Sequence, residues 1–232
     1  GQAQVTPERR AVRIPRITKG VLSPDEDVRD ISGAQFGRAA NFGMREIVGY
    51  VPVEPDGSVR ARVPADAPLG LQLVDADGKA VFSRHGAWLN LRPGETLQCQ
   101  GCHRTNNPQP HGRTDGMAPS IHDGAPATGQ PFPNSRADVV PFADAGETMA
   151  QALARFLPDS EWPAINMQAF DAWSDPAPDP ADELLLSYDD LETPAPATAG
   201  CQAQWQPECR TVIHYEDHIQ PIWDLPRVAD VG

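Results

Sequence analysis

Short apolar runs separated by turn-forming residues characterise the chain from residue 44 to residue 98. The runs recur about every ten residues and predict strands at 46–53, 59–63, 69–74, 79–82 and 87–91. Clusters of proline, glycine and aspartate stand between them and predict turns at 55–58, 75–78 and 92–95. Arginine alternates with apolar residues in 59–63, which predicts one buried and one solvated face. The pattern is typical of a β-sandwich of the immunoglobulin or transthyretin kind.

One helix is expected further along the chain. Apolar residues recur on one helical face between residues 146 and 157, and Pro158 ends the pattern. The face predicted to be buried consists of Met149, Ala152, Leu153, Phe156 and Leu157. Near the C-terminus, 210–215 is predicted to be a strand and 216–223 to begin a helix.

The other segments show no clear periodicity. Residues 104–145 are rich in Pro, Gly, Asn and Asp and predict a long loop. Residues 158–200 form an acidic, proline-rich segment with Trp162, Phe170 and Trp173 spaced along it. The predicted fold is mainly β, with an appended loop-rich lobe that contains a few short helices. Its parts are an extended N-terminal arm (1–43), the sandwich (44–98) and the lobe with a C-terminal strand (99–232).

Composition narrows the class of protein. The 232 residues include 25 prolines and 19 glycines but only 6% aromatics, so a lean core is expected to need a covalent cofactor or a disulfide. The net charge of −13 argues against binding to nucleic acid or to anionic lipid, and it suits a soluble protein or a basic partner. No apolar run is long enough to insert into a membrane.

The candidate chemistry follows the last predicted strand of the sandwich, in Cys99-Gln-Gly-Cys102-His103. C-x-x-C-H is the attachment pattern of c-type haem, in which each thiol adds to one vinyl group and the histidine binds the iron. The pattern predicts one covalent haem c. A thioredoxin-type redox pair, a structural zinc site completed by His111 and His122, and a chance match are the alternatives.

Several residues are candidates for the second axial position on the iron. His111 is preferred because it lies in the loop expected to cover the haem, and His85 is the second candidate. A methionine thioether or an open site is also possible, with Met44, Met117, Met149 and Met167 available. Arg113 could pair with a haem propionate. Two filled axial positions favour electron transfer, whereas an open position favours small-molecule chemistry.

Two further cysteines, Cys201 and Cys209, remain once the haem motif is set aside. We expect them to form a disulfide, because disulfides and covalent haem both belong to oxidising compartments. This predicts a periplasmic or otherwise extracytoplasmic location. The chain begins with glycine, which suggests a processed or excised piece.

The order of several motifs is similar to one known family. Four segments carry the likeness: Gly49–Ser58, Val63–Ala65, Arg92–Glu95 and Cys99–His103. In this order they resemble the middle, haem-bearing domain of the hydrazine synthase alpha subunit and its relatives in bacterial multihaem proteins. The resemblance covers roughly residues 44–111 and continues more loosely through Gly146–Met149 and Cys209–Arg210.

The resemblance carries two implications about the site. Relatives continue beyond a stretch like His218–Trp223 into a second C-x-x-C-H, so a downstream haem domain of the same polypeptide, or a separate redox protein, is the expected partner. In hydrazine synthase a tyrosine four residues after the motif histidine holds the haem, and that histidine binds zinc. Asn107 stands at that position in this chain, which favours the simpler arrangement with His103 on the iron.

The function expected from these features is electron transfer within a larger extracytoplasmic multihaem protein. One alternative is a catalytic, five-coordinate haem that acts on a small nitrogen or oxygen species. The other is a structural module that docks neighbouring domains.

Overall fold

The chain was analysed as a computed structural model. The residues it describes are 12–23, 25, 27–28, 32, 43–81, 85–99, 132, 135–169, 172–173, 184–187, 190, 193–204, 206, 209 and 211–226.

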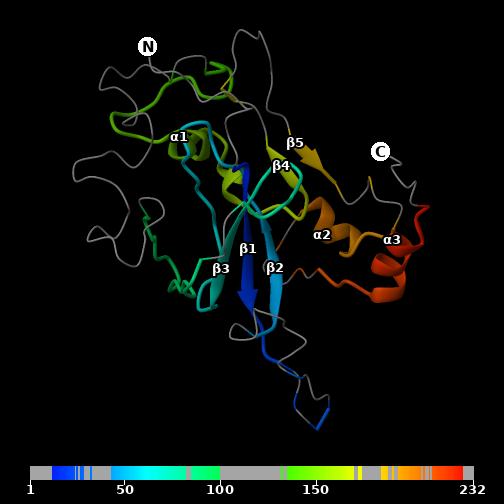
Figure 1. Cartoon of the computed structure of the whole chain (residues 1–232). Helices are drawn as coiled ribbons and strands as arrows, with labels where there is room; N and C mark the ends of the chain where they lie inside the picture. Colours follow the sequence, from blue (N-terminus) through cyan, green and yellow to red (C-terminus); the bar gives the residue numbers. More distant parts are fainter. Residues whose placement is uncertain are drawn as a thin grey trace.

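A three-stranded antiparallel sheet forms the centre of the molecule (Figure 1). Its strands are β1 (Ile14–Gly20), β2 (Arg45–Tyr50) and β3 (Leu69–Val74), in the order β2-β1-β3. Ile17 of β1 stands opposite Gly49 on one side and Leu71 on the other. The pairing of β1 with β2 shifts register after Ile17, as at a β-bulge.

The central strand β1 lies within the segment that the sequence suggested as an arm. Ile14 and Ile17 are essentially inaccessible to solvent, so this strand contributes two fully buried side chains to the apolar core. Pro15 and the charged Arg16, which lie between the two isoleucines, obscure the periodicity in the sequence. The division of the chain at residues 43 and 98 stays a prediction.

The predicted strands at 46–53 and 69–74 are confirmed, the first in shortened form as β2 and the second as β3. The predictions at 59–63, 79–82 and 87–91 were wrong, because within the described residues these segments form single bridges or no bridge at all. The alternation nevertheless assigns the two faces correctly for residues 60–63, whereas Val59 is exposed. Arg60 and Arg62 both bond to the carboxylate of Glu161, while the apolar residues between and after them pack on the core.

The described residues therefore confirm a mainly β fold with few helices. Besides the central sheet they form one two-stranded sheet, β4 (Met167–Ala169) with β5 (Leu184–Leu186). The predicted turns are present at 54–58, where the amide of Glu54 bonds to Ser58 O, and at 75–79, where Asp75 N bonds to Lys79 O.

The predicted helix is confirmed as α1 (Met149–Phe156). Thr148 caps its N-terminus through a capping box with Gln151, which satisfies amide groups that the first turn leaves unbonded. Met149, Ala152 and Leu153 are buried in a cluster with Phe132, Val140, Ala143, Ala172 and Trp173. Leu157 is exposed, and the 3-10 helix η3 (Pro158–Glu161) follows.

Buried polar bonds attach α1 to the turn at 54–58. The Asp56 side chain is inaccessible to solvent, its Oδ2 accepts from the amide of Met149 at 3.0 Å, and its Oδ1 accepts from the Ser58 amide and hydroxyl. Ser58 Oγ in turn accepts from the amide of Ala150. The nearby Glu54 carboxylate accepts a bond from the indole of Trp173. The Asp56 carboxylate thus fastens the start of α1 to the turn at 54–58, and the Glu54 carboxylate holds Trp173, which belongs to the same buried cluster as α1.

The C-terminal part contains α2 (Ala199–Ala203), the π-helix η5 (Tyr215–Ile219) and α3 (Gln220–Asp224). The prediction of a strand at 210–215 was wrong for the described residues, since 211–214 belong to no strand and Tyr215 begins the π-helix. The apolar residues of this run are half exposed and have no sheet to join. The helix expected from residue 216 is confirmed in part.

Gly49 allows the close approach of β2 to residues 163–164. Its φ is +151°, and a Cβ there would lie 2.7 Å from Pro163 Cβ and 2.8 Å from Ala164 O. Tyr50 and Ala164 exchange two backbone hydrogen bonds of 2.8 Å beside it.

The substitution Gly49→Ala is expected to lower the free energy of unfolding by about 2 kcal/mol or more, because both the backbone angle and the contact become unfavourable. Urea denaturation measures this. Gly86→Ala is the matched control, since a Cβ at Gly86 meets nothing within 4 Å. Equal stability of the two variants would contradict the proposed packing.

Candidate functional site

The segment that leads to the C-x-x-C-H motif runs along the free edge of β3. Leu69 and Leu89 exchange two backbone hydrogen bonds, the amide of His85 bonds to Leu71 O, and Asp66 N bonds to Leu91 O. The predicted turn at 92–95 follows. There the amide of Arg92 donates to the Glu95 carboxylate at 2.8 Å, and Gly94 has φ +75°. The edge of the sheet and this turn together fix where the chain departs toward Cys99.

Cys99 is exposed, and its thiol is not part of a disulfide. The preceding residues are exposed too, including Leu97 with 48% of its surface accessible. The other residues predicted for the site, Cys102, His103, His111 and Arg113, lie outside the described residues. Their positions stay predictions from the sequence.

His85, the second candidate for the distal ligand, is held at the edge of β3. Its backbone amide bonds to Leu71 O, and its Nδ1 lies 2.8 Å from Ala87 O. Because a carbonyl oxygen only accepts, Nδ1 must donate, which leaves the lone pair of the neutral ring on Nε2. Histidines that bind metals commonly have this tautomer, fixed by a backbone carbonyl.

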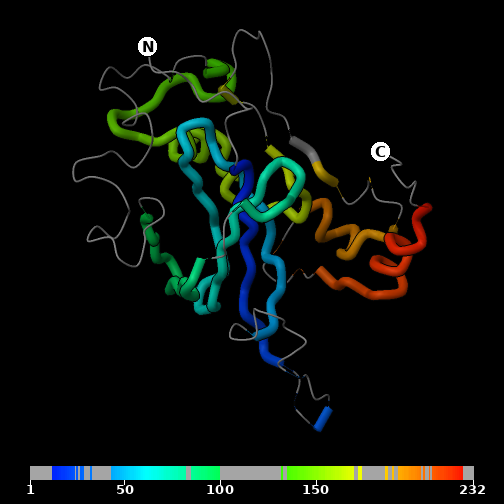
Figure 2. Tube along the Cα trace, in the orientation of Figure 1, coloured from blue at the N-terminus to red at the C-terminus, as the bar shows by residue number. Residues whose placement is uncertain are grey.

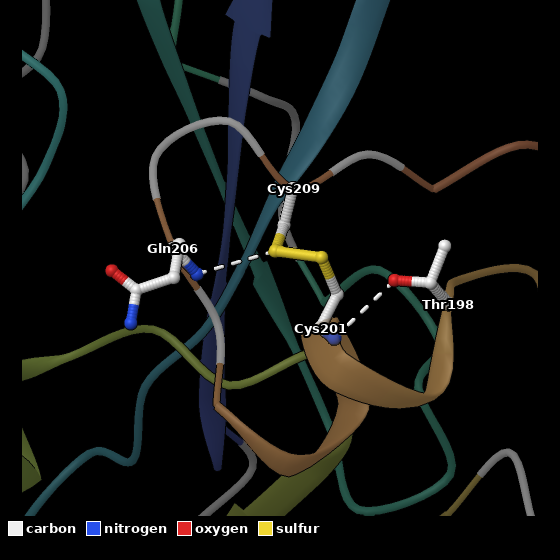
Figure 3. The surroundings of a disulfide bond; sticks show 4 residues. All are labelled: Thr198, Cys201, Gln206 and Cys209. Carbon is white, nitrogen blue, oxygen red and sulfur yellow. Dashed lines mark hydrogen bonds between the residues drawn. A yellow bond between two sulfur atoms is a disulfide. The ribbon is translucent and has the colours of Figure 1, made fainter.

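The disulfide expected between Cys201 and Cys209 is present (Figure 3). The two Cα atoms are 5.7 Å apart, and Cys201 lies in α2, which Thr198 caps. The Gln206 amide bonds to Cys209 Sγ within the closed loop. This bond uses two of the four cysteines and leaves Cys99 and Cys102 for other chemistry. The cysteines of the motif are thus compatible with two thioether bonds to a haem.

Two of the candidate methionines are packing residues. Met149 is 1% exposed in the core beneath α1, and Met167 is buried against Ile14 and Val74. Their thioethers fill the interior, as methionine commonly does.

No cluster of three His, Cys, Asp or Glu side chains forms a metal site among the residues that the structure describes. The zinc alternative depends on residues outside that set. None of the helices in the described part of the chain has the length and apolarity needed to cross a bilayer.

Sequence reasoning missed the buried carboxylates of Glu54, Asp56 and Glu161. Each is paired with a group distant in sequence. Glu54 accepts from Trp173, Asp56 accepts from the amide of Met149, and Glu161 pairs with Arg60 and Arg62. A turn pattern indicates that Asp56 bonds locally, but it gives no signal of the second bond to a helix 93 residues away.

The described residues form a mainly β fold, and the segment at the edge of its central sheet leads to Cys99, the first residue of the C-x-x-C-H motif. Residues 10–104 match the family described as the hydrazine synthase alpha subunit middle domain. The match begins before β1 and extends past the motif histidine. The match therefore includes both the central strand and the motif.

One curated relative is the hydrazine synthase subunit alpha of Kuenenia stuttgartiensis. It is 39% identical to this chain over 62 residues, which are 27% of this chain and 8% of the relative. The chain thus matches only a small part of the relative's length. No solved structure matches the chain.

Proposed function

We propose that this domain carries one covalent haem c and transfers electrons within a larger extracytoplasmic multihaem protein. Cys99 and Cys102 form the thioether bonds, and His103 is an axial ligand of the iron. The bound haem supplies a one-electron couple. The chain's own residues fix the position and axial ligation of the group, and the sheet, extended into a sandwich-like scaffold, carries the loop-rich haem lobe.

The observation that carries this proposal is the division of the four cysteines. Cys201 and Cys209 are joined, whereas the thiol of Cys99 is exposed and close in sequence to the motif histidine. A disulfide also suits the oxidising compartment in which covalent haem attachment takes place. The family match supports the proposal because it includes residues 99–103.

The second candidate function is catalysis by a five-coordinate haem on a small nitrogen or oxygen species. It is favoured by the identity shared with a protein named as a hydrazine synthase subunit. The two functions differ at the distal axial position. Electron transfer is expected to use a low-spin iron with both positions filled, because little then rearranges on reduction.

The visible spectrum of the ferrous protein, with and without carbon monoxide, tests the choice. Electron transfer predicts a low-spin spectrum that carbon monoxide changes slowly or not at all. Rapid formation of a carbonyl adduct would assign the domain to the catalytic class instead.

Replacing the distal ligand is expected to convert a six-coordinate spectrum into a high-spin one. The first variant is His111→Ala, and His85→Ala is its matched partner, since each removes one candidate imidazole. Electron paramagnetic resonance of the ferric protein reads the spin state directly. An unchanged spectrum in His111→Ala together with a high-spin spectrum in His85→Ala would assign the position to His85, whose tautomer already suits it.

A further inference from the structure

Large apolar side chains are exposed at several neighbouring positions of the sequence near the C-terminus. The described residues include fourteen exposed large hydrophobics, and six of them fall within the fourteen positions from 212 to 225. We call these six the C-terminal apolar face: Val212, Ile213, Tyr215, Ile222, Trp223 and Leu225. Neither η5 nor α3 contains a buried residue, and in Figures 1 and 2 both lie at the rim of the molecule. So many exposed large apolar side chains within one short segment favour a role in an interface.

The face is held in position by bonds on its N-terminal side. The amide of Val212 donates to Pro196 O at 2.7 Å, and the Cys201–Cys209 disulfide closes the loop just before it. The amide of His214, the residue before η5, donates to Nδ1 of His218 at 2.9 Å. A surface ordered before binding loses less conformational entropy when a partner arrives.

The part of the chain that carries the face also carries most of its charge. From Asp171 to Gly232 the sequence has thirteen Asp and Glu residues and two Arg, a charge of −11 out of −13 for the whole chain. Among the described residues between 193 and 226 there is no lysine or arginine, and Glu216, Asp217 and Asp224 are exposed beside the apolar side chains. The apolar face therefore has an acidic surround.

This charge excludes two of the possible occupants. In a symmetric dimer the acidic surround would face its own copy, and like charges at an interface cost several kcal/mol. An anionic lipid surface would repel the segment in the same way. A protein surface with an apolar centre and a rim of lysine and arginine satisfies both parts of the face.

We infer that the C-terminal apolar face is a docking site for a basic protein partner. Trp223 and Tyr215 are of the types that contribute most of the energy at interfaces, and they form its anchors. The surrounding carboxylates attract and orient the partner over long range. The site involves none of the haem-motif residues, so it stands or falls separately from the proposed function.

Photo-crosslinking in the organism that makes the full polypeptide tests the inference. p-Benzoylphenylalanine is placed at position 223, and at position 162 as the control, since Trp223 and Trp162 are 59% and 45% exposed on different elements. The expected result is a product at position 223 alone. The crosslinked partner surface should carry apolar residues surrounded by lysine and arginine. A second copy of the chain, a lipid, the same product at both positions or no product would overturn the inference.

The identified partner is then titrated with the purified full chain. Trp223→Ala is expected to weaken binding about tenfold or more at every salt concentration. The triple variant Glu216→Gln, Asp217→Asn, Asp224→Asn should weaken it at low salt and flatten its salt dependence. Binding unaffected by Trp223→Ala would contradict the docking role, whatever the haem content of the same samples.

Discussion

Asp56→Ala is expected to lower the free energy of unfolding by about 2–4 kcal/mol. The carboxylate is inaccessible to solvent and accepts from the amides of Ser58 and Met149 and from the Ser58 hydroxyl. Its removal leaves buried donors without an acceptor and separates the start of α1 from the turn at 54–58. Asp56→Asn keeps one amide oxygen as an acceptor, so an intermediate loss is expected.

Urea denaturation followed by tryptophan fluorescence measures the effect, because the buried Trp173 lies in the core beneath α1. Asp77→Ala is the matched control, an aspartate in an exposed turn whose side chain is 72% accessible. Its loss is expected to stay within about 0.5 kcal/mol. If Asp56→Ala is as stable as this control, the buried bonds do not fasten the helix.

The double variant Cys99→Ala, Cys102→Ala is expected to contain no covalently bound haem. Each single variant should keep one thioether and one unreacted vinyl group. Because that vinyl group stays conjugated with the ring, the α band of the pyridine haemochrome moves to longer wavelength. The spectrum of each variant therefore reports how many thiols have reacted.

The pair Cys201→Ser, Cys209→Ser is the control for this experiment. It removes two thiols that the structure joins to each other, so the band position of the wild type is expected to persist in whatever haem-loaded protein is recovered. The chain is expected to be less stable, since a disulfide over so short a loop contributes about 2–3 kcal/mol. A band shift in this control would mean that the thioethers had been assigned to the wrong cysteines.

The sequence predicted elements well wherever the signal was local. The helix α1 followed from a repeated apolar stripe and a terminating proline, and the turns followed from Asp-Gly and Pro-Gly pairs. Strand pairing is not local, and the alternation in 59–63 shows the difference. The alternation predicted exposed arginines and apolar residues packed on the core. Arg60 and Arg62 instead pair with Glu161, and the segment pairs with no strand of the described residues.

The strand β1 could not be recognised because its evidence lies in its neighbours. Its buried residues Ile14 and Ile17 are separated by Pro15 and Arg16. This spacing does not show the alternation of apolar and polar residues that is typical of a strand. Only the pairing with β2 and β3, distant segments of the chain, makes the segment a central strand. Long-range pairing of this kind leaves little trace in a single sequence.

The candidate site, like the fold, has a part that the sequence predicts and a part that depends on long-range contacts. The C-x-x-C-H pattern is contiguous and could be read directly, and the pairing of Cys201 with Cys209 followed once those thiols were set aside. The distal ligand depends on how distant loops fold over the haem, which spacing alone does not encode. The structure adds the tautomer of His85 and the packing of Met149 and Met167, two facts that only folded neighbours could supply.

The most direct test of covalent haem attachment is the intact mass of the mature, unreduced polypeptide, measured under denaturing conditions that strip any non-covalent group. For a chain of residues 1–232, the expected mass is that of the polypeptide plus one haem, with the haem recovered on the peptide that contains Cys99 and Cys102. A mass equal to that of the polypeptide alone, or a zinc ion released from residues 99–111 in its place, would contradict the assignment.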